Sequence, residues 1–479
     1  MRALSIAKAA ANLWDLPRLL TNEGHPVLWY ALLWFGYHLA PTPLVLQGIS
    51  IAIALLAVLV FWLSCPFLRW LKLLFLFSFL PLYEYSVIAR NYGISMLLFF
   101  VFAAFYGKLR ADYAGRWLLA FVLALLANTN VHSAILSGFL TLYWAADSRP
   151  TTWSSGKAMT FFMPIGLVAT GLGFCLFTVL PDSNSIVMNP TALTTGKLLS
   201  ALSDSLLHPG RGLNELFTGL PSVGRDILVW LLVLCLALRP LAALLLFAGV
   251  VTVTLFFAIG YSGTLRHEGI VWTYLITLYW LVYESNNNQY HKIRNKLHFI
   301  GLYGLIACVL LVHVAGSARY IYRDLTVEIS SAKSFGRFIA SNELYRQAII
   351  IGEPDIRLES LPAYADNRIY LPRAGLFRDY VRLTTENKPE LSLGELLDSA
   401  KQLRQREKCP VLIALGHFDL AGQPLPYIRT EQYDRKFTWT DAELNDFLTA
   451  TEKVAEFKSD LKNERYEVYL LQETDRLKP

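Results

Sequence analysis

Four short segments of the sequence combine ionisable side chains with amides or aromatic rings in a pattern that could support group transfer. They are Glu23–Pro26, Tyr83–Gly93, Asn128–Ser133 and Arg266–Gly269, which read EGHP, YEYSVIARNYG, NTNVHS and RHEG. An arginine presents a planar fork that forms charge-assisted, bidentate hydrogen bonds with phosphate. A neighbouring carboxylate can remove the proton from an attacking hydroxyl. If the segments meet, they predict transfer of a group from a phosphate-linked donor.

Within these segments we expect Glu84, Arg90, Arg266 and His267 to line one cavity. Charges beside hydrocarbon are costly and need partners, and a bound phosphate would supply one. The further candidates for this cavity are Glu23, His25, Asn91, Tyr92, Asn128, Asn130 and His132.

Simpler interpretations of the same residues remain open. Arg90 could anchor a helix end at the membrane surface by snorkelling beside the tyrosines around it. Helix capping, a helix break or a turn would equally explain His25, His132, Asn128 and Asn130. Arg266 and His267 are harder to explain in this way, because cationic residues directly before an outer helix start oppose the usual charge bias.

The composition places these segments in a membrane protein. Hydrophobic residues make up 54% of the 479 residues and charged residues 17%, with a mean hydropathy of +0.39. A soluble domain carries about 25% charged residues, and the repeated apolar runs indicate a polytopic membrane protein. The net charge of +6 follows membrane topology and does not indicate nucleic-acid binding.

The five cysteines have no metal or redox spacing, so we predict neither metal nor cofactor.

The apolar runs predict a polytopic α-helical membrane protein with about ten transmembrane helices, followed by a soluble α/β domain. Residues 1–43 are expected at the outer membrane face, residues 44–317 in the helical domain and residues 318–479 in the α/β domain. Val27–Leu39 is too short to span, since a span needs about 20 residues, and suits an interfacial helix. The candidate spans are Leu44–Ser64, Phe67–Leu82, Ile94–Tyr106, Trp117–Ala127, Ser133–Ala146, Phe161–Leu180, Ile227–Leu238, Leu241–Gly260, Ile270–Tyr283 and Phe299–Gly316.

Basic residues fall into alternate loops between these spans. One set of loops carries Arg69, Lys72, Lys108, Arg110, Arg116, Arg149, Lys157, Arg239, Lys292, Arg294 and Lys296. Loops rich in lysine and arginine remain in the cytoplasm. The four polar segments and everything after Ser317 belong to the other set, so they are expected outside the cytoplasm.

The C-terminal part has a pattern of alternating strands and helices. Ala348–Ile351, Arg368–Leu371, Val411–Leu415 and Val468–Leu471 are predicted strands. Leu393–Arg406 and Asp441–Phe457 have helical spacing and charge. Such alternation predicts a small α/β domain with a parallel sheet.

The polar segments also resemble a known family. The segment EGHPVLWYALLW resembles the first outer loop of GT-C superfamily glycosyltransferases, and YEYSVIARNYG resembles their outer segment with an Arg-x-Tyr at a helix start. NTNVHS and RHEG are similar to motifs of a bacterial branch near the Rgt-type lipopolysaccharide glycosyltransferases. The resemblance covers Leu13 to about Gly316 and, more loosely, the C-terminal domain.

This resemblance implies an enzyme of the bacterial inner membrane that uses a polyprenyl-phosphate-linked sugar as donor. It implies an inverting transfer to an envelope glycan, lipid or protein on the periplasmic face, with a lipid phosphate as leaving group. By position, Arg90, Arg266 and His267 would hold the phosphate, and Glu23 and His25 would line the acceptor side. A transporter or flippase of lipid-linked sugars, or a non-catalytic envelope scaffold, are the alternatives.

The expected base motif of this family is not found in the sequence. The family places an acidic pair at the end of a first transmembrane helix. Here the only nearby carboxylates are Asp15, Glu23 and Glu84, of which Glu23 and Glu84 are the candidate bases. A positively charged tail with Arg2, Lys8 and Arg18 is also disfavoured on the outer side. We therefore expect the reading frame upstream of Met1 to encode an apolar run of about 20 residues and an acidic pair.

Overall fold

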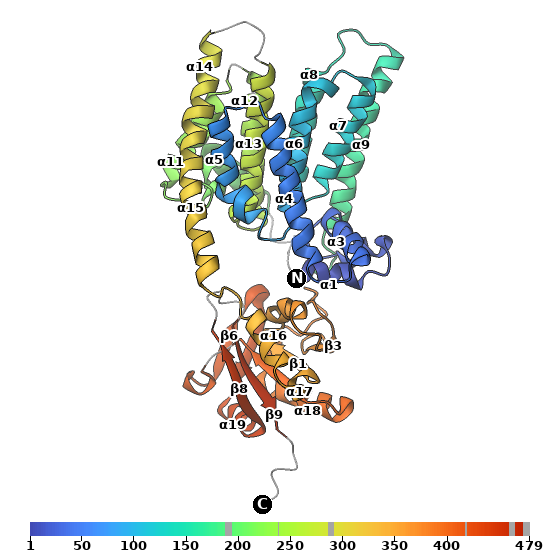
Figure 1. Cartoon of the computed structure of the whole chain (residues 1–479), viewed down its shortest axis with the longest axis vertical. Coiled ribbons are helices and arrows are strands. Elements are labelled where there is room, and N and C mark those ends of the chain that lie inside the picture. The colour runs from blue at the N-terminus through green and yellow to red at the C-terminus, as the bar shows by residue number, and fades with distance from the viewer. Residues whose placement is uncertain (187–193, 238, 286–291, 417–418, 459–464, 473–479) are drawn as a thin grey trace, which may run out of the picture. The chain divides into compact units, whose positions relative to one another are not determined.

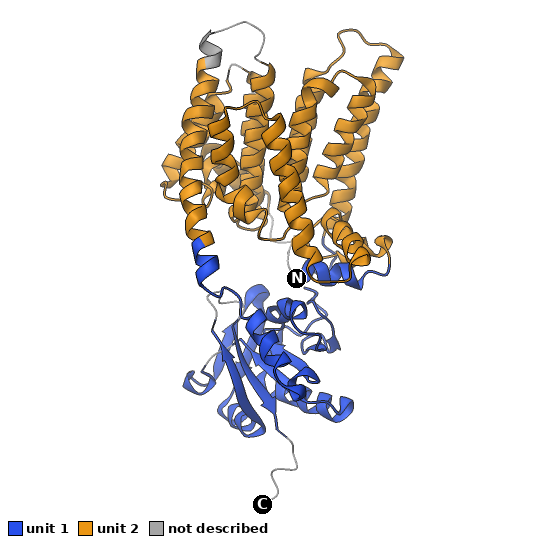
Figure 2. Cartoon of the chain, in the orientation of Figure 1, with its two compact units in different colours: residues 1–11, 181–189, 322–479 blue, residues 12–180, 190–321 orange. Residues whose placement is uncertain are grey.

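The computed structural model describes residues 1–186, 194–237, 239–285, 292–416, 419–458 and 465–472. The chain forms two compact units (Figure 2). Residues 12–180 and 190–321 form one of them, which we call the helical unit. Residues 1–11, 181–189 and 322–479 form the other, the α/β unit. The first residues therefore pack with the C-terminal part of the chain, although residues 1–43 were expected to form one outer segment.

The helical unit is built from helices and short helical turns (Figure 1). They are η1 Leu13–Asp15, α2 Leu16–Leu19, α3 Leu28–Leu39, α4 Val45–Ser64, α5 Arg69–Phe77, η2 Leu80–Glu84, α6 Tyr92–Leu109, α7 Tyr113–Ala127, α8 Val131–Asp147, α9 Ser155–Val179, α10 Thr195–Leu207, η4 Pro209–Leu213, α11 Ser222–Leu234, α12 Pro240–Ile259, α13 Leu265–Ser285, α14 Lys292–Ile300, η5 Gly301–Ile306 and α15 Ala307–Thr326, which continues into the α/β unit.

Five of the described helices are long and apolar enough to cross a membrane. They are α4, α6, α9, α12 and the continuous helix Lys296–Thr326. In α4, small or aromatic side chains such as Ala57 and Phe61 are buried, whereas Leu55, Leu59 and Leu63 are exposed. A helix with leucines on its exposed face suits lipid as its surroundings. The sequence thus correctly predicted a helical protein with apolar helices of membrane length.

The polar NTNVHS segment is a tight connection between two helices. Helices α7 and α8 run in opposite directions side by side (Figure 1), joined by Asn128, Thr129 and Asn130. The Asn130 side chain caps α8 by accepting a hydrogen bond from the Ser133 amide at 2.9 Å. A polar side chain at this position satisfies an amide that the helix itself leaves free.

The polar segments and the basic segments lie at opposite ends of the helical unit. Because α6, α7, α8 and α9 alternate in direction (Figure 1), Tyr92 and Asn130 share one end of the unit. At the other end, Arg110 after α6 forms an ion pair with Asp147 at the end of α8. The Arg239 side chain donates a hydrogen bond to the Ser285 carbonyl at 3.2 Å, which joins the start of α12 to the end of α13.

The α/β unit contains two sheets and the helices around them (Figure 1). Its elements are α1 Arg2–Ala9, α16 Ala332–Ala340, α17 Glu343–Arg346, β1 Ile349–Glu353, η6 Asp355–Ala363, β2 Ile369–Leu371, β3 Leu376–Phe377, β4 Glu390–Ser392, α18 Leu393–Glu407, β5 Val411–Leu415, η7 Leu420–Gly422, β6 Tyr427–Thr430, η8 Gln432–Asp434, β7 Lys436–Trp439, α19 Asp441–Ala450, β8 Thr451–Phe457 and β9 Tyr466–Leu471.

The larger sheet has the strand order β3-β2-β1-β5-β9-β8. Strand β1 pairs in parallel with β2 on one side and β5 on the other. Alternate residues of β1 enter different hydrophobic clusters: Ile349 and Ile351 pack with α18, whereas Ile350 packs with Phe335 of α16. Helices therefore cover both faces of the sheet, as a central parallel strand requires.

Two sequence predictions for this unit were wrong in part. The sheet is mixed, because β3, β8 and β9 pair in antiparallel fashion at its edges. The predicted helix Asp441–Phe457 ends at Ala450, and Thr451–Phe457 forms β8 instead. The charges of TEKVAEF resemble the exposed face of a helix, but pairing with β9 outweighs this local preference.

A buried ion pair joins the two sheets of the α/β unit. Arg373 and Glu353 have fully buried side chains and form a salt bridge at 2.7 Å. Arg373 also donates hydrogen bonds to the carbonyls of Lys388, Pro389 and Lys436, which adjoin the small sheet β4-β7-β6. Every polar contact of the guanidinium group thus ties the end of β1 to the second sheet.

We expect Arg373→Met to destabilise the α/β unit by about 3–5 kcal/mol, because it leaves the Glu353 charge buried without its partner. Thermal unfolding of the purified chain, together with its rate of tryptic digestion, measures the change. The control is Arg346→Met, which breaks the exposed ion pair with Glu343 and should change stability by less than about 0.5 kcal/mol. Equal stability of the two variants would contradict a stabilising role for the buried pair.

Candidate functional site

The segment around η2 packs against the beginning of α13 in the helical unit. The Tyr85 hydroxyl donates a hydrogen bond to the Arg266 carbonyl at 2.7 Å. A Cβ atom on Gly269 would lie 2.4 Å from Leu80 Cδ2 and 2.5 Å from the Tyr85 hydroxyl. Only glycine permits this approach, so the RHEG sequence brings α13 directly against the YEYSVIARNYG segment.

Glu84, Arg90 and Arg266 act on one another electrostatically at this contact. Glu84 ends η2 and is 8% exposed. Burial raises its pKa to about 7, against the opposing effect of the Arg266 and Arg90 charges. Arg90 is exposed, yet desolvation by the surrounding protein lowers its pKa, and the charge of Arg266 lowers it further.

The two arginines lack a direct carboxylate partner. In the part of the chain that the structure describes, neither guanidinium group forms a salt bridge, and Arg266 Nε is buried without a hydrogen-bond partner. Tyr92 interacts with the Arg266 side chain. Two neighbouring cations that repel each other, one of which has a buried donor without a partner, form a site suited to an anion.

Histidine and tyrosine rings extend this cluster along α8 and α13. The His267 and His132 ring centroids are 5.1 Å apart, and His267 lies 5.4 Å from Tyr92. The Thr264 amide donates a hydrogen bond to His267 Nδ1 at 3.0 Å. Because an amide can only donate, the neutral ring carries its proton on Nε2. His132, which is 2% exposed, contacts the Tyr261 hydroxyl through Nε2 at 3.0 Å.

The predicted asparagines occupy two different environments. Asn91 donates to the Thr129 carbonyl at 2.6 Å, and Asn130 donates to the Ser95 hydroxyl at 2.8 Å. These bonds fix the start of α6 against the α7–α8 turn, directly beside Arg90. Asn128 instead donates to the Ala124 and Gly171 carbonyls, both at 2.9 Å. It therefore joins α7 to α9 and is not brought into contact with the arginines.

His25 joins the cluster, and Glu23 lies in the same loop. His25 is close enough to act electrostatically on both His132 and His267. Glu23 lies two residues earlier in the same loop with a half-buried side chain. The amide of Leu28, at the start of α3, donates to the Asn128 carbonyl at 3.3 Å, so the EGHP loop and the α7–α8 turn are neighbours.

Sequence reasoning missed several residues that build this region. Glu268 was not among the predicted cavity residues: it is 1% exposed, and its carboxylate accepts hydrogen bonds from the Glu215 and Leu216 amides at 2.9 and 2.7 Å. It thereby holds the segment after η4 against α13. Ser95 and Tyr261 were also missed, since a single serine or tyrosine beside an apolar run carries no specific signal.

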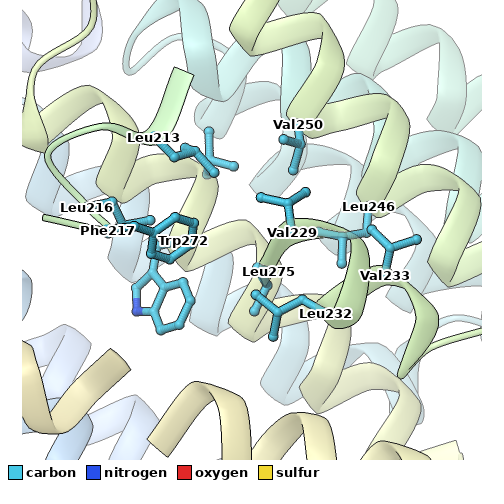
Figure 3. Close-up of a pocket in the computed structure, with 11 residues that line it drawn as sticks. Leu213, Leu216, Phe217, Val229, Leu232, Val233, Leu246, Val250, Trp272 and Leu275 are labelled. Atoms are coloured by element: carbon cyan, nitrogen blue, oxygen red, sulfur yellow. The ribbon is translucent and has the colours of Figure 1, made fainter. Parts of the chain in front are cut away.

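A separate cavity of the helical unit is apolar. Leu213, Val229, Leu246, Trp272 and other side chains from η4, α11, α12 and α13 line it (Figure 3). Its volume is about 10 Å³, which is close to the minimum for one water molecule. With no polar lining group and so little space, it is a packing defect between helices and holds no substrate.

No protein-family model matches this sequence, and no curated protein is significantly similar to it. Among the described residues, no group of three or more histidine, cysteine, aspartate or glutamate side chains is arranged to hold a metal ion. The chemistry of the site must therefore be inferred from the cluster itself, which offers two arginines, a carboxylate of raised pKa and a histidine Nε2 donor.

Proposed function

We propose that this protein is a membrane glycosyltransferase related to the GT-C superfamily. It would transfer a sugar from a polyprenyl-phosphate-linked donor to an envelope glycan, lipid or protein on the periplasmic face. The observation that carries the proposal is the pair Arg90 and Arg266, which lie close enough to Glu84 and to each other to interact electrostatically, with the Nε group of Arg266 buried and without a partner among the described residues. Arginine forks match phosphate oxygens in geometry and charge.

In this mechanism the arginines bind the phosphate of the donor, assisted by the Nε2 proton of His267. Glu84 accepts the proton of the acceptor hydroxyl while the oxygen of that hydroxyl forms a bond to the anomeric carbon. The bond between that carbon and the phosphate oxygen breaks on the opposite face, which inverts the configuration. Polyprenyl phosphate leaves with the bonding electrons, and Arg90 and Arg266 stabilise the charge that it gains.

The proposal is tested by donor turnover. The purified chain in lipid nanodiscs is incubated with a radiolabelled polyprenyl-phosphate sugar and a bacterial envelope extract as acceptor. A transferase releases polyprenyl phosphate and labels the acceptor fraction. Movement of intact donor across a sealed vesicle without its cleavage would instead identify a flippase, and neither activity would identify a scaffold.

We further propose about ten membrane crossings, with the polar cluster and the α/β unit on the periplasmic side. This arrangement rests on the basic residues at the opposite end of the helical unit, such as Arg110, Arg149 and Arg239. The helices α5, α7, α8 and α11 are shorter than a full span, and they would cross as part of the packed bundle.

Cysteine labelling of intact cells tests this orientation. Asp366 lies in an exposed loop of the α/β unit, so Asp366→Cys should react with a membrane-impermeant maleimide before lysis. The background carries Cys308→Ser and Cys409→Ser, because these two thiols are the accessible ones among the described cysteines. Labelling that occurs only after lysis would place the α/β unit in the cytoplasm.

A further inference from the structure

The α/β unit contains a cavity of mixed polar and apolar lining that the proposed transfer reaction does not use. It has a volume of about 150 Å³ and is lined by Ile186, Leu383, Thr384, Thr385, Asn387, Lys388, Pro389, Tyr433 and Arg435. Its wall is formed by two segments far apart in the sequence: the Thr385 amide donates to the Asn184 carbonyl at 2.8 Å, and the Ile186 amide donates to the Leu383 carbonyl at 3.3 Å.

This cavity adjoins the carboxyl ends of the central strands. Strand β2, which follows β1 in the chain, pairs with one side of β1, and the later strand β5 pairs with the other side. The strand order therefore reverses between β1 and β5, which is a topological switch point. Ligands of open α/β sheets bind outside the carboxyl ends of strands at such a point. Asp355, two residues after β1, forms a buried ion pair with Arg435 of the cavity wall.

Arg435 and Asp355 retain unused hydrogen-bonding capacity. Arg435 is 6% exposed, and within the described residues its Nε atom has no partner. Asp355 is 1% exposed, and its Oδ2 atom likewise lacks a partner there. Buried polar atoms normally find a partner, and Arg435 lines the cavity, so its Nε group is available to a ligand bound there.

The backbone beside the cavity is also strained. Tyr433 and its neighbour Asp434 have φ angles of 64° and 55°, in the left-handed region that side chains other than glycine rarely adopt. Each such residue costs on the order of 1 kcal/mol or more. Tyr433 itself lines the cavity, and it also packs against the hydrophobic cluster that contains Phe335.

The charges around the cavity favour a neutral ligand over an anion. Arg435 is paired with Asp355, and Lys388 forms a salt bridge with Glu395 at 3.1 Å. The Thr384 and Thr385 side chains line the cavity together with Tyr433. Asn387 lines it too, and its Nδ2 group donates a hydrogen bond to the Arg382 carbonyl. A sugar ring matches this lining, because it has hydroxyls at its edge and C–H groups on its face.

From this combination we infer that the α/β unit carries a saccharide-binding site for a single neutral sugar residue, formed by Tyr433, Arg435, Thr384, Thr385 and Asn387. The inference does not depend on the proposed transferase activity, since a protein of another function could use the same site to bind an envelope glycan.

Saturation-transfer NMR on the full chain tests the site. The protein is placed in nanodiscs prepared without sugar-headed detergents, and methyl α-D-glucopyranoside, methyl α-D-mannopyranoside and methyl β-D-galactopyranoside serve as probes. At least one should receive saturation from the protein. Tyr433→Gly, which removes the ring and suits the positive φ, should weaken binding about five- to tenfold, as expected for loss of one aromatic contact.

Asp434→Gly is the matched control, because it relieves the same backbone strain without altering the cavity lining. It should bind the probe as the unmodified chain does. The exposed, isosteric substitution Thr385→Val is a second variant that should weaken binding without affecting folding. Failure of all three probes with a folded protein would overturn the inference. Binding that is unchanged in Tyr433→Gly and Thr385→Val would also overturn the inference. The same holds if only Arg90→Lys abolishes binding, because the sugar would then bind in the helical unit.

Discussion

Replacing Arg90 with lysine is expected to lower the rate of sugar transfer about a hundredfold while the protein still inserts and folds. Loss of one preorganised donor to developing charge typically costs about 10²–10³ in rate, and a lysine cannot reproduce the bidentate fork. The rate is measured as release of polyprenyl phosphate from labelled donor by purified protein in nanodiscs.

This substitution separates the two interpretations of Arg90. A residue that only snorkels to anchor the helix end could be replaced by lysine, since both side chains bury an apolar stem and expose a charge. Full activity of Arg90→Lys would therefore favour the anchoring role. The control is Arg110→Lys at the opposite end of the helical unit, where the ion pair with Asp147 is partly exposed and contributes little.

A double-mutant cycle adds a check on geometry. If Arg90 and Arg266 bind the same phosphate, the combined substitution Arg90→Lys/Arg266→Lys should cost less than the product of the single effects, because residues that share a partner are not additive. Independent, multiplicative effects would indicate that the two side chains serve different parts of the protein.

Long apolar runs and buried strands were predictable because their signals are local. The run Leu44–Ser64 is α4 at Val45–Ser64, and Val411–Leu415 is β5 with the predicted bounds. Both faces of β5 are buried, so its continuous apolar sequence is enough to predict a buried strand. The strand β8 depends on its partner β9, and no local pattern of TEKVAEF reveals that pairing.

The sequence suggested candidate residues for the site but not the contacts between them. Ionisable side chains at the ends of apolar runs identified Glu84, Arg90, Arg266 and His267 from the sequence. Their proximity depends on Gly269, whose missing side chain lets α13 approach η2. Neither this packing nor the difference between Asn128 and Asn130 could be read from the sequence, since both depend on contacts between distant helices.

Replacing Glu84 with glutamine is expected to lower transfer about a thousandfold, because general acid–base catalysis contributes about 10²–10⁴. Glutamine keeps the size and polarity of the side chain but cannot accept a proton from the acceptor hydroxyl. Glu23→Gln is the comparison, since Glu23 is the other candidate base. If only Glu23→Gln abolishes transfer, the proton acceptor is Glu23.

The pH dependence gives an independent test of Glu84. Its pKa is raised to about 7, and a base acts only when deprotonated, so activity should be low below this pH and rise as the carboxyl ionises. For a single group of pKa about 7, kcat/KM should be about tenfold higher at pH 8 than at pH 6. Glu84→Gln should retain low activity without this rise, and Glu84→Asp should retain the rise at a reduced rate. An unchanged inflection near pH 7 in Glu84→Gln would show that another group titrates and that Glu84 is not the base.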